Sequence, residues 1–444
     1  MIRHTPNSFI TRQFNQISAE GWVALWRKSG LLLRVVLKPL HINYIKFAVI
    51  LIRALHPLVI VRFKQMDSGR IGAAYQVDWY LSEKLDGMLN GRYLDIFYVI
   101  QSTNHVNKQW LKMWKRVLPI RKENSFWQRV HRINRNLPGF EQNEVPDHHI
   151  YPSLEEWQEH LVNPSRGKID KYNKKLKAVL KNKIANITFT TDEEKKGIQV
   201  LKSLGIQRDR EYICLHSRDS AFLDAACPQR DWKYHNYRDS HIQNYVPAAE
   251  AMAKCGYYAI RMGAVVKDPV YSSNPKIIDY ATNGQRTDFN DIYIASHCRF
   301  FLGSDGGPSI IPEMFRIPMV YVNWSLILFI SVWVTKALII FKKFYLKDQN
   351  RFMTFSEIMN LEFGGRDTNE IFDKLDLELI ENTPEEIHAV TVEMDERLNG
   401  TWQTTKEDEE LQQRFWALFG PDKLKSPDLR IGADYLRKNK DLLD

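Results

Sequence analysis

Short apolar runs alternate with helix-like stretches along most of this chain, and this alternation restricts its fold more than any other feature. Four of the runs lie at residues 212–215, 257–261, 300–302 and 319–322, with helical patterns between them. Strands buried on both faces of a parallel sheet read as continuous apolar runs, because neither face meets water. Strands alternating with helices are typical of sheets that helices cover. The sequence therefore predicts an α/β protein built on parallel sheets.

The alternation occurs in two series. The first reads strand 58–63, helix 73–85, strand 93–100 and helix 109–117, and an irregular or helical insertion follows it. The second begins near residue 188, where Thr191 is the expected N-cap of a helix that carries acidic residues in its first turn. Its further expected elements are helices at 242–254, 288–296 and 309–315 and a strand at 276–279. Two series of this kind predict two Rossmann-like domains.

Domain boundaries follow from these series. We expect one domain at 58–187 and a second at 188–365. The pattern after Arg351 becomes helical, so a C-terminal helical segment is expected at 366–444.

Positive charge is concentrated at the N-terminus. The whole chain has a net charge of +9, and residues 1–64 contain ten basic residues and one acidic residue, so the remaining chain is balanced. A nucleic-acid partner is therefore disfavoured, because phosphate binding needs the charge on a folded face.

Residues 1–57 alternate apolar clusters with isolated cations, and Pro39 and Pro57 divide them. The uncharged run 47–52 is six residues long, whereas a membrane span needs about 20. We expect basic amphipathic helices that lie on an anionic membrane surface. The alternative is a helical cap on the body of the protein.

Neither a membrane span nor a disulfide framework is favoured elsewhere. The stretch Ile317–Thr335 has 19 uncharged residues, but Pro318 and Asn323 interrupt it, so its first part is expected to be a buried strand. The four cysteines lie far apart without a C-x-x-C pair, which argues against a zinc site and against disulfides. A reducing, cytosolic compartment fits best.

Polar and small residues follow several predicted strands. Ligands bind at the carboxyl ends of strands in open α/β sheets, so these positions are the candidate site. The candidate donor-binding residues are His216, Arg218, Arg238, Arg261, Gly303, Ser304, Gly306, Gly307, Ser309 and Glu313.

The loop 303–309 is expected to approach a diphosphate. Its glycines allow close contact by backbone N–H groups, and the start of the following helix adds donors. It matches neither G-x-G-x-x-G nor a P-loop, so a dinucleotide oxidoreductase or an ATPase is not supported. A tight turn between strand and helix is the alternative. Glu313 could accept hydrogen bonds from ribose hydroxyls, or it could be a surface carboxylate.

Arg218, Arg238 and His216 have two interpretations each. Arg218 can present a fork of donors to phosphate, or it can form an ion pair with Asp219 or Asp239. Arg238 is either a phosphate contact or part of an ion pair near a helix cap. Arg261 would support the same ligand, and His216 would contact phosphate or sugar unless it is a structural histidine.

Several of these segments together resemble a family of predicted bacterial glycosyltransferases that occur among genes for surface polysaccharides. The segments are Leu-His-Ser-Arg-Asp-Ser at 215–220, His-Asn-Tyr-Arg-Asp at 235–239, Ala-Ile-Arg-Met-Gly at 259–263, Ile-Asp-Tyr at 278–280, Thr-Asp-Phe-Asn-Asp-Ile-Tyr at 287–293 and Phe-Leu-Gly-Ser at 301–304. The resemblance covers roughly residues 58–365. It implies a GT-B fold, in which two Rossmann-like domains flank a cleft and the C-terminal one holds most of the nucleotide sugar.

The His216-x-Arg218 pattern is also similar to the phosphate-binding H-x-R of fucosyltransferases of this fold. Asp219 stands where their second arginine is expected, so a guanosine donor carrying fucose is not implied. GT-B enzymes often place acceptor or base residues in the first domain. That makes Asp67 a candidate catalytic base and Arg70 a candidate charge clamp.

No two aspartates are separated by a single residue, so the D-x-D metal motif of the other large glycosyltransferase class is absent. A reaction without metal or cofactor is expected, in which cations and helix starts stabilise the departing nucleoside diphosphate.

The expected function is transfer of a sugar from a nucleoside diphosphate donor to a lipid-linked or saccharide acceptor in lipopolysaccharide or capsule biosynthesis. The expected location is the inner face of the cytoplasmic membrane, with peripheral attachment to that anionic surface. The alternatives are a nucleotide-sugar epimerase of the same fold and a non-catalytic, membrane-docked scaffold of polysaccharide assembly. Nucleic acid is not an expected partner.

Overall fold

The computed structural model describes most of the chain from residue 43 onward. The described residues are 43–66, 71, 74–89, 91–99, 107–121, 126–146, 176–207, 209–304, 306–327, 330, 334, 336–361, 368–419 and 425–444. The chain divides into two compact units. The small unit comprises residues 1–66, 91–100 and 119–146, and the large unit comprises 67–90, 101–118 and 147–444.

The small unit is built on a three-stranded parallel sheet in the order β1-β2-β3. Its elements are β1 (Ile60–Met66), β2 (Tyr93–Val99), β3 (Ile120–Arg121), α4 (Phe126–Asn134) and the 3-10 turn η2 (Phe140–Asn143). Arg62 and Asp95 are register partners on β1 and β2, and they form a two-pronged ion pair at 2.7 and 2.8 Å. Paired charges of this geometry fix the register of the two strands, because a slip would leave both charges buried and unpaired.

A helix at residues 43–54 precedes this sheet. Ile45, Val49 and Ile52 on one of its faces pack into the core of the small unit with Phe63 and Val130. This part of the basic N-terminal segment is therefore a helical cap, as the alternative interpretation held. Its other face also carries apolar side chains, which are 51–64% exposed: Tyr44, Phe47, Ile50 and Leu51. Residues 1–42 lie outside the described residues.

The large unit contains a seven-stranded sheet in the order β13-β9-β8-β7-β4-β5-β6, and every pairing in it is parallel. The strands are β4 (Tyr212–His216), β5 (Tyr258–Arg261), β6 (Ile277–Ile278), β7 (Phe301–Gly303), β8 (Met319–Trp324), β9 (Ala337–Phe341) and β13 (Leu429–Ile431). Counted along the chain, the order from β6 is 3-2-1-4-5-6-7. This is the doubly wound Rossmann order, and its direction reverses between β4 and β7.

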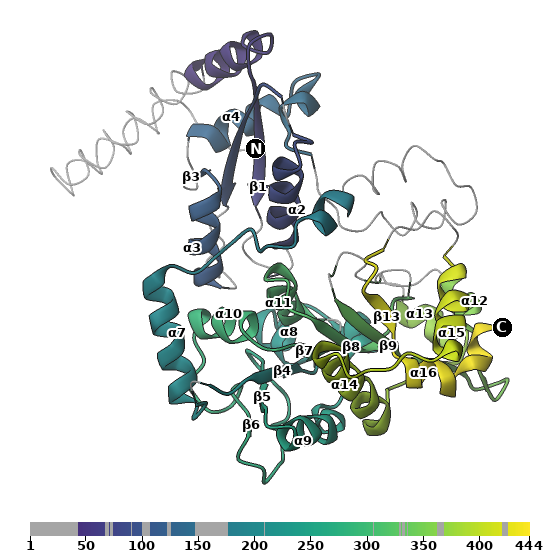
Figure 1. Ribbon diagram of the computed structural model, residues 1–444. Helices are drawn as coiled ribbons and strands as arrows, with labels where there is room; N and C mark the ends of the chain where they lie inside the picture. Colours follow the sequence, from purple (N-terminus) through teal and green to yellow (C-terminus); the bar gives the residue numbers. More distant parts are fainter. Residues whose placement is uncertain are drawn as a thin grey trace, which may run out of the picture. The chain divides into compact units, whose positions relative to one another are not determined.

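Helices cover both faces of this sheet. Figure 1 shows α9 (Val246–Lys254) and α14 (Pro384–Asn399) on one side, and α10 (Asp288–Ser296) and α11 (Ile310–Met314) on the other. The large unit also contains α2 (Ala74–Leu85), α3 (Lys108–Val117) and α7 (Thr191–Ser203). The predicted fold class, an α/β protein with parallel sheets in two Rossmann-like parts, is confirmed.

The assignment of α2 and α3 to the large unit differs from the predicted domain at 58–187. The positions of both helices in the sequence were predicted correctly, but ion pairs join them to other segments of the large unit. On α3, Lys112 and Arg116 each lie 2.7 Å from the carboxylate of Glu193 on α7. On α2, Asp78 lies 3.0 Å from Arg316, and both side chains are almost fully buried. Sequence order alone could not reveal such contacts between distant segments.

The start of α7 lies one residue earlier than predicted. Thr190, not Thr191, is the N-cap, because its hydroxyl accepts a hydrogen bond from the N–H of Glu193. In return, the Glu193 carboxylate accepts a hydrogen bond from the backbone N–H of Thr190, with 2.9 Å between nitrogen and oxygen. The Thr-x-x-Glu spacing of this capping box selects Thr190.

The C-terminal segment contains strands as well as helices. Besides α13 (Thr368–Lys374), α14, α15 (Lys406–Ala417) and α16 (Ala433–Lys438), it contributes β12 (Leu377–Ile380) and β13. β12 and β11 (Arg351–Phe352) flank β10 (Lys343–Leu346) in an antiparallel sheet, close to α12 (Phe355–Met359) in the chain. β13 pairs with β9 at the edge of the main sheet. Residues 366–444 are thus an integral part of the large unit.

The apolar stretch Ile317–Thr335 begins with β8, so the prediction of a buried strand there is confirmed. Among the described residues, no helix has the length and apolar character that crossing a membrane requires.

Candidate functional site

The carboxyl ends of β4 and β7 lie side by side at the point where the strand order of the large unit reverses. Such a switch point is where open α/β sheets bind ligands, because the chain leaves the two strands toward opposite faces. The N–H of Arg218, just after β4, donates to the Ser304 hydroxyl at 2.8 Å, just after β7. The N–H of Ser304 donates to the carbonyl of His216 at 3.2 Å. The structure therefore brings these predicted residues together.

His216 is the buried centre of this edge and is 7% exposed. Burial, and then the charges of Arg261 and Arg218, lower its pKa to about 3. The ring is therefore neutral at physiological pH. Its Nδ1 is buried and has no hydrogen-bond partner in the part of the chain that the structure describes. Gly306 packs closely on the ring, since a Cβ at this glycine would lie 3.1 Å from His216 Cε1.

Arg218 forms an ion pair with Asp239, and its side chain is 9% exposed. The ion-pair alternative is therefore realised with Asp239 rather than Asp219. The Asp219 carboxylate instead accepts the N–H groups of Ala221 and Lys267, both at 3.0 Å. This ion pair holds the guanidinium at the sheet edge, where its charge still contributes to lowering the pKa of His216.

Lys342 was missed in the sequence analysis and belongs to the same cluster. It follows β9 directly, is 4% exposed, and its ammonium donates to the carbonyl of Asp239. Burial lowers its pKa to about 8, with Glu381 opposing and Arg218 adding to that shift. The apolar run 337–341 could have been predicted as a strand. Lys342 would then have been a candidate, because the other candidates were found as residues that directly follow a strand.

Arg238 lies in the 3-10 helix η3 (Lys233–Arg238), and its guanidinium is 3.0 Å from Nδ1 of His235. Burial, then Arg238 and Arg218, lower the pKa of His235 to about 4. Arg238 and Arg218 therefore both place positive charge close to His235, and Arg218 and Lys342 both bond to Asp239.

Arg261 ends β5 and is 1% exposed. It donates to the Asp279 carboxylate at 3.2 Å and to the Asp268 carbonyl at 3.1 Å. The second Asp279 oxygen accepts the N–H of Val270 at 3.0 Å. Arg261 thereby fixes the long connection after β5 and adds to the positive field at His216.

The loop between β7 and α11 makes several of its own hydrogen bonds. The Ser309 hydroxyl donates to the Ser304 carbonyl at 3.1 Å, and the Ser309 N–H donates to the Gly306 carbonyl at 3.2 Å. A 3-10 turn, η5 (Gly307–Ser309), precedes α11, whereas the sequence predicted an α-helix from Ser309. Pro308 in this turn has no N–H, which reduces the donors at the helix start. A Cβ at Gly307 would lie 2.7 Å from Ile71 Cγ2.

Glu313 is buried, at 5% exposure, so the surface-carboxylate alternative is wrong. Its two oxygens accept hydrogen bonds from the hydroxyls of Tyr75 on α2 and Tyr321 on β8. A contact with ribose stays a prediction.

The predicted catalytic residues Asp67 and Arg70 lie outside the described residues. Among those that the structure describes, no group of three or more His, Cys, Asp or Glu residues could hold a metal ion.

The sequence matches no family model and no curated protein. Among solved structures, the chain is similar to E. coli ADP-heptose LPS heptosyltransferase II, with 11% identity and a TM-score of 0.38, over 71% of this chain and 98% of that one. It is also similar to the glycosyl transferase family 9 structure from Veillonella parvula, with 10% identity and a TM-score of 0.33, over 60% and 81%. A UDP-N-acetylglucosamine 2-epimerase is 10% identical with a TM-score of 0.28, over 78% and 98%. At these TM-scores, the residues of the site carry the functional argument.

Proposed function

We propose that this protein is a glycosyltransferase that moves a sugar from a nucleoside diphosphate donor to a lipid-linked or saccharide acceptor. One observation carries the proposal. A neutral, buried histidine with an unpartnered nitrogen lies at the switch point of a Rossmann-type sheet, and the charges of Arg218 and Arg261 act on it. A positive, water-poor edge of this kind favours a diphosphate, and neutral His216 can then hydrogen-bond to a phosphate or sugar oxygen.

The chemistry follows from this charge distribution. The bond between the anomeric carbon and the diphosphate oxygen breaks, and both electrons go to that oxygen. The acceptor hydroxyl oxygen bonds to the anomeric carbon, and its proton passes to a base, which we assign to Asp67; we assign Arg70 as a charge clamp. Arg218, Arg238 and Lys342 would stabilise the negative charge that develops on the leaving diphosphate, so no metal is required. Surface polysaccharide, such as lipopolysaccharide or capsule, is the proposed destination.

Ligand binding and product analysis together test this function. Thermal shifts with ADP, UDP, GDP, CDP, TDP and CMP would identify the base. The matching nucleotide sugar would then be incubated with and without saccharide acceptors. Release of the free nucleoside diphosphate that depends on acceptor is expected. A changed sugar still joined to its diphosphate would instead indicate an epimerase. Failure of every nucleotide to bind would indicate a non-catalytic scaffold.

We also propose that the protein attaches peripherally to the inner face of the cytoplasmic membrane. The outer face of helix 43–54 supports this proposal, since Phe47 and Ile50 are each 64% exposed and the exposed Lys46 directly precedes Phe47 in the sequence. Apolar side chains flanked by cations bind the interface of an anionic bilayer.

A further inference from the structure

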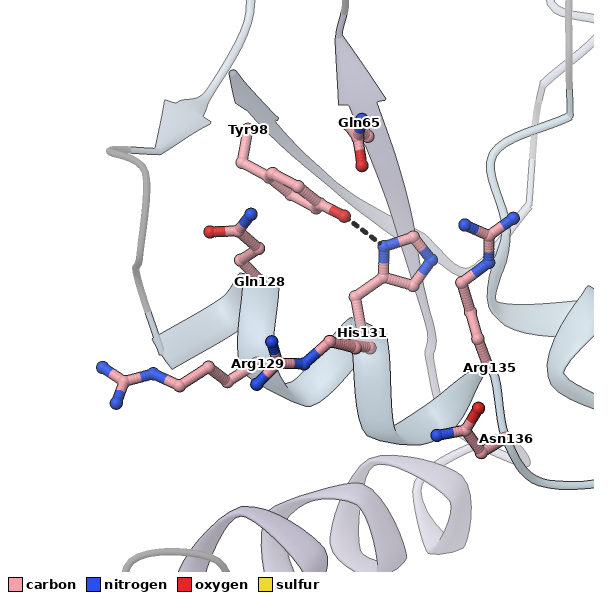
Figure 2. Close-up of a pocket in the computed structure, with 8 residues that line it drawn as sticks. Gln65, Tyr98, Gln128, Arg129, His131, Arg135 and Asn136 are labelled. Carbon is pink, nitrogen blue, oxygen red and sulfur yellow. Dashed lines mark hydrogen bonds between the residues drawn. The ribbon is translucent and has the colours of Figure 1, made fainter. Parts of the chain in front are cut away.

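The small unit contains a cavity at the carboxyl ends of β1 and β2, with a volume of about 610 Å³. Gln65 and Tyr98 line it from the strands, and they are register partners, so their side chains leave the sheet on the same side. The other lining residues belong to α4 and the turn after it, as Figure 2 shows. Small-molecule sites have volumes of roughly 300–1,000 Å³, so the cavity can hold a sugar with its substituents.

The lining is cationic. Arg129, Arg132 and Arg135 all line the cavity, and their spacing of three residues places them along one side of the α4 helix and its continuation. None of the described lining residues is acidic. The nearby carboxylate of Glu144 is shared between Arg135 at 3.2 Å and His131 at 2.5 Å. Guanidinium groups bind carboxylates and phosphates through paired hydrogen bonds, so the lining favours an anion.

A chain of hydrogen bonds fixes the inner wall. His131 is 1% exposed, its Nε2 bonds Glu144, and its Nδ1 lies 2.7 Å from the Tyr98 hydroxyl (Figure 2). A carboxylate only accepts, so Nε2 donates to Glu144, and in the tautomer with its proton on Nε2 the ring accepts the Tyr98 hydroxyl at Nδ1. Phe63 stacks on the ring with centroids 5.1 Å apart. The Tyr98 oxygen keeps lone pairs that can accept a hydrogen bond from a ligand hydroxyl.

The remaining lining groups are carboxamides, from Gln65, Gln128 and Asn136. Carboxamides both donate and accept, which suits sugar hydroxyls. A cavity that combines arginines, carboxamides and one oriented phenol fits a polar anionic ligand better than an apolar one.

We propose that this cavity binds the saccharide acceptor through a phosphate or carboxylate group on that saccharide. The inference rests on the proposed transfer reaction, since it assigns the acceptor to the small unit and the donor to the edge at His216. Arg129 and Arg132 hold the anionic group, and Tyr98 and the carboxamides hold the hydroxyls. The opposite side of α4 packs on helix 43–54, so a lipid-linked acceptor held here would keep its lipid close to the membrane-facing helix.

The test measures binding of small probes to the full chain by calorimetry. The probes are a hexose 6-phosphate, glucuronate, an uncharged hexose and vesicles containing phosphatidylglycerol. Wild type is expected to bind at least one anionic sugar and to bind the uncharged hexose much more weakly. The double variant R129Q/R132Q should lose about tenfold or more in affinity for that anionic sugar. The control R121Q, an exposed arginine of β3 outside the cavity, should stay within about twofold of wild type.

The outcomes separate this proposal from the proposed function. Nucleoside diphosphate binding should be unchanged in R129Q/R132Q. If wild type binds no nucleoside diphosphate, the proposed transfer reaction is refuted, but anion binding in the cavity is not. Preference for phosphate or for carboxylate identifies the anion on the acceptor. Failure of both anionic sugars to bind wild type at millimolar concentration would overturn the proposal. So would a double variant that loses vesicle binding while binding the sugars normally, since the arginines would then serve lipid headgroups.

Discussion

Among the described residues, each unit of this protein buries one histidine near the carboxyl end of its parallel sheet, and the two histidines have opposite surroundings. His216 of the large unit lies in the field of two arginines, and its Nδ1 has no partner among the described residues. His131 of the small unit has both nitrogens engaged, one with Tyr98 and one with Glu144. Both rings are almost fully buried, at 7% and 1% exposure.

The difference shows that the surrounding residues decide whether a buried histidine can contact a ligand or only positions another side chain. Burial, together with Arg261 and Arg218, holds His216 neutral. Its Nδ1 has no partner among the described residues, so it can contact a ligand. A carboxylate and a phenol saturate His131, so it can only position Tyr98, and the arginines around it must bind the ligand. Four predictions test this contrast.

The largest effect is expected from removing the saturated histidine. His131→Ala deletes a stacked ring and leaves the Tyr98 hydroxyl and the Glu144 carboxylate without their main partner. We expect it to lower the free energy of unfolding by about 3 kcal/mol. His216→Ala deletes a ring of the same size whose Nδ1 makes no hydrogen bond, and it should cost clearly less, about 1–2 kcal/mol. Urea denaturation of both variants measures the difference.

Ligand binding should show the reverse order. His216→Ala should weaken nucleoside diphosphate binding, whereas His131→Ala should leave it unchanged as long as the protein is folded. Equal losses of stability, together with equal effects on nucleotide binding, would contradict the assignment of separate roles.

The next effect concerns the cation beside His216. Arg218→Ala removes a charge-assisted contact with the diphosphate and should cost about 1.5–3 kcal/mol of donor binding. Because this change also leaves Asp239 unpaired, the double variant Arg218→Ala/Asp239→Ala keeps the test valid if the single variant unfolds. Calorimetry with the nucleotide that binds best gives the measurement.

A matched control is Arg430→Ala. Arg430 pairs with Glu409 at 2.7 Å and lies on β13, at the far edge of the same sheet. It should not change donor affinity. Unchanged nucleotide binding in a folded Arg218→Ala protein would remove Arg218 from the site.

A pH titration tests Lys342. Its pKa of about 8 means that it is charged at neutral pH and loses its proton as the pH rises through that value. A diphosphate prefers the charged form, so the association constant should fall by up to about tenfold per pH unit above 8. In the unfolded chain the lysine keeps its proton to higher pH. Stability of the free protein should therefore rise with pH over the same range, opposite in sign to binding.

Lys342→Met should flatten both profiles. Lys425 provides the control, because burial also lowers its pKa and it bonds the backbone beside β13. Lys425→Met should alter the pH dependence of stability alone. A binding profile that stays steep in Lys342→Met would exclude this residue from the donor site.

Much of the large unit was predictable from the sequence, and the small-unit cavity was not. The bounds of α10 agree with the prediction, and β4 agrees within one residue, because apolar runs and capping residues are local signals. His216, Arg218 and Ser304 were found because parallel strands bring all their carboxyl ends to one edge. Lys342 was missed only because the run before it was not recognised as a strand.

Tyr98, His131 and Glu144 could not be found in this way. They come from a strand, a helix and the extended residue after η2, which no motif connects, and only tertiary packing joins them. β13 escaped prediction for a similar reason, since three residues carry no periodic pattern and their pairing with β9 makes them a strand. Local propensity predicts elements well, whereas contacts between distant segments decide which short elements and polar clusters form.

The smallest effect is expected at the outer face of helix 43–54. This face is the proposed membrane contact of the small unit, and the large unit is proposed to have none. Ile50→Ala should weaken flotation with phosphatidylglycerol vesicles about fivefold, near 1 kcal/mol, because only part of an interfacial side chain leaves water. Ile198→Ala on α7 is the control, since Ile198 is 43% exposed in the large unit. A variant that lacks residues 1–42 retains the helix face with Ile45, Val49 and Ile52, which fills the core of the small unit. This variant should therefore fold and bind nucleotide. If Ile198→Ala weakens flotation as much as Ile50→Ala does, membrane contact is not specific to this helix, and its role reduces to capping the sheet.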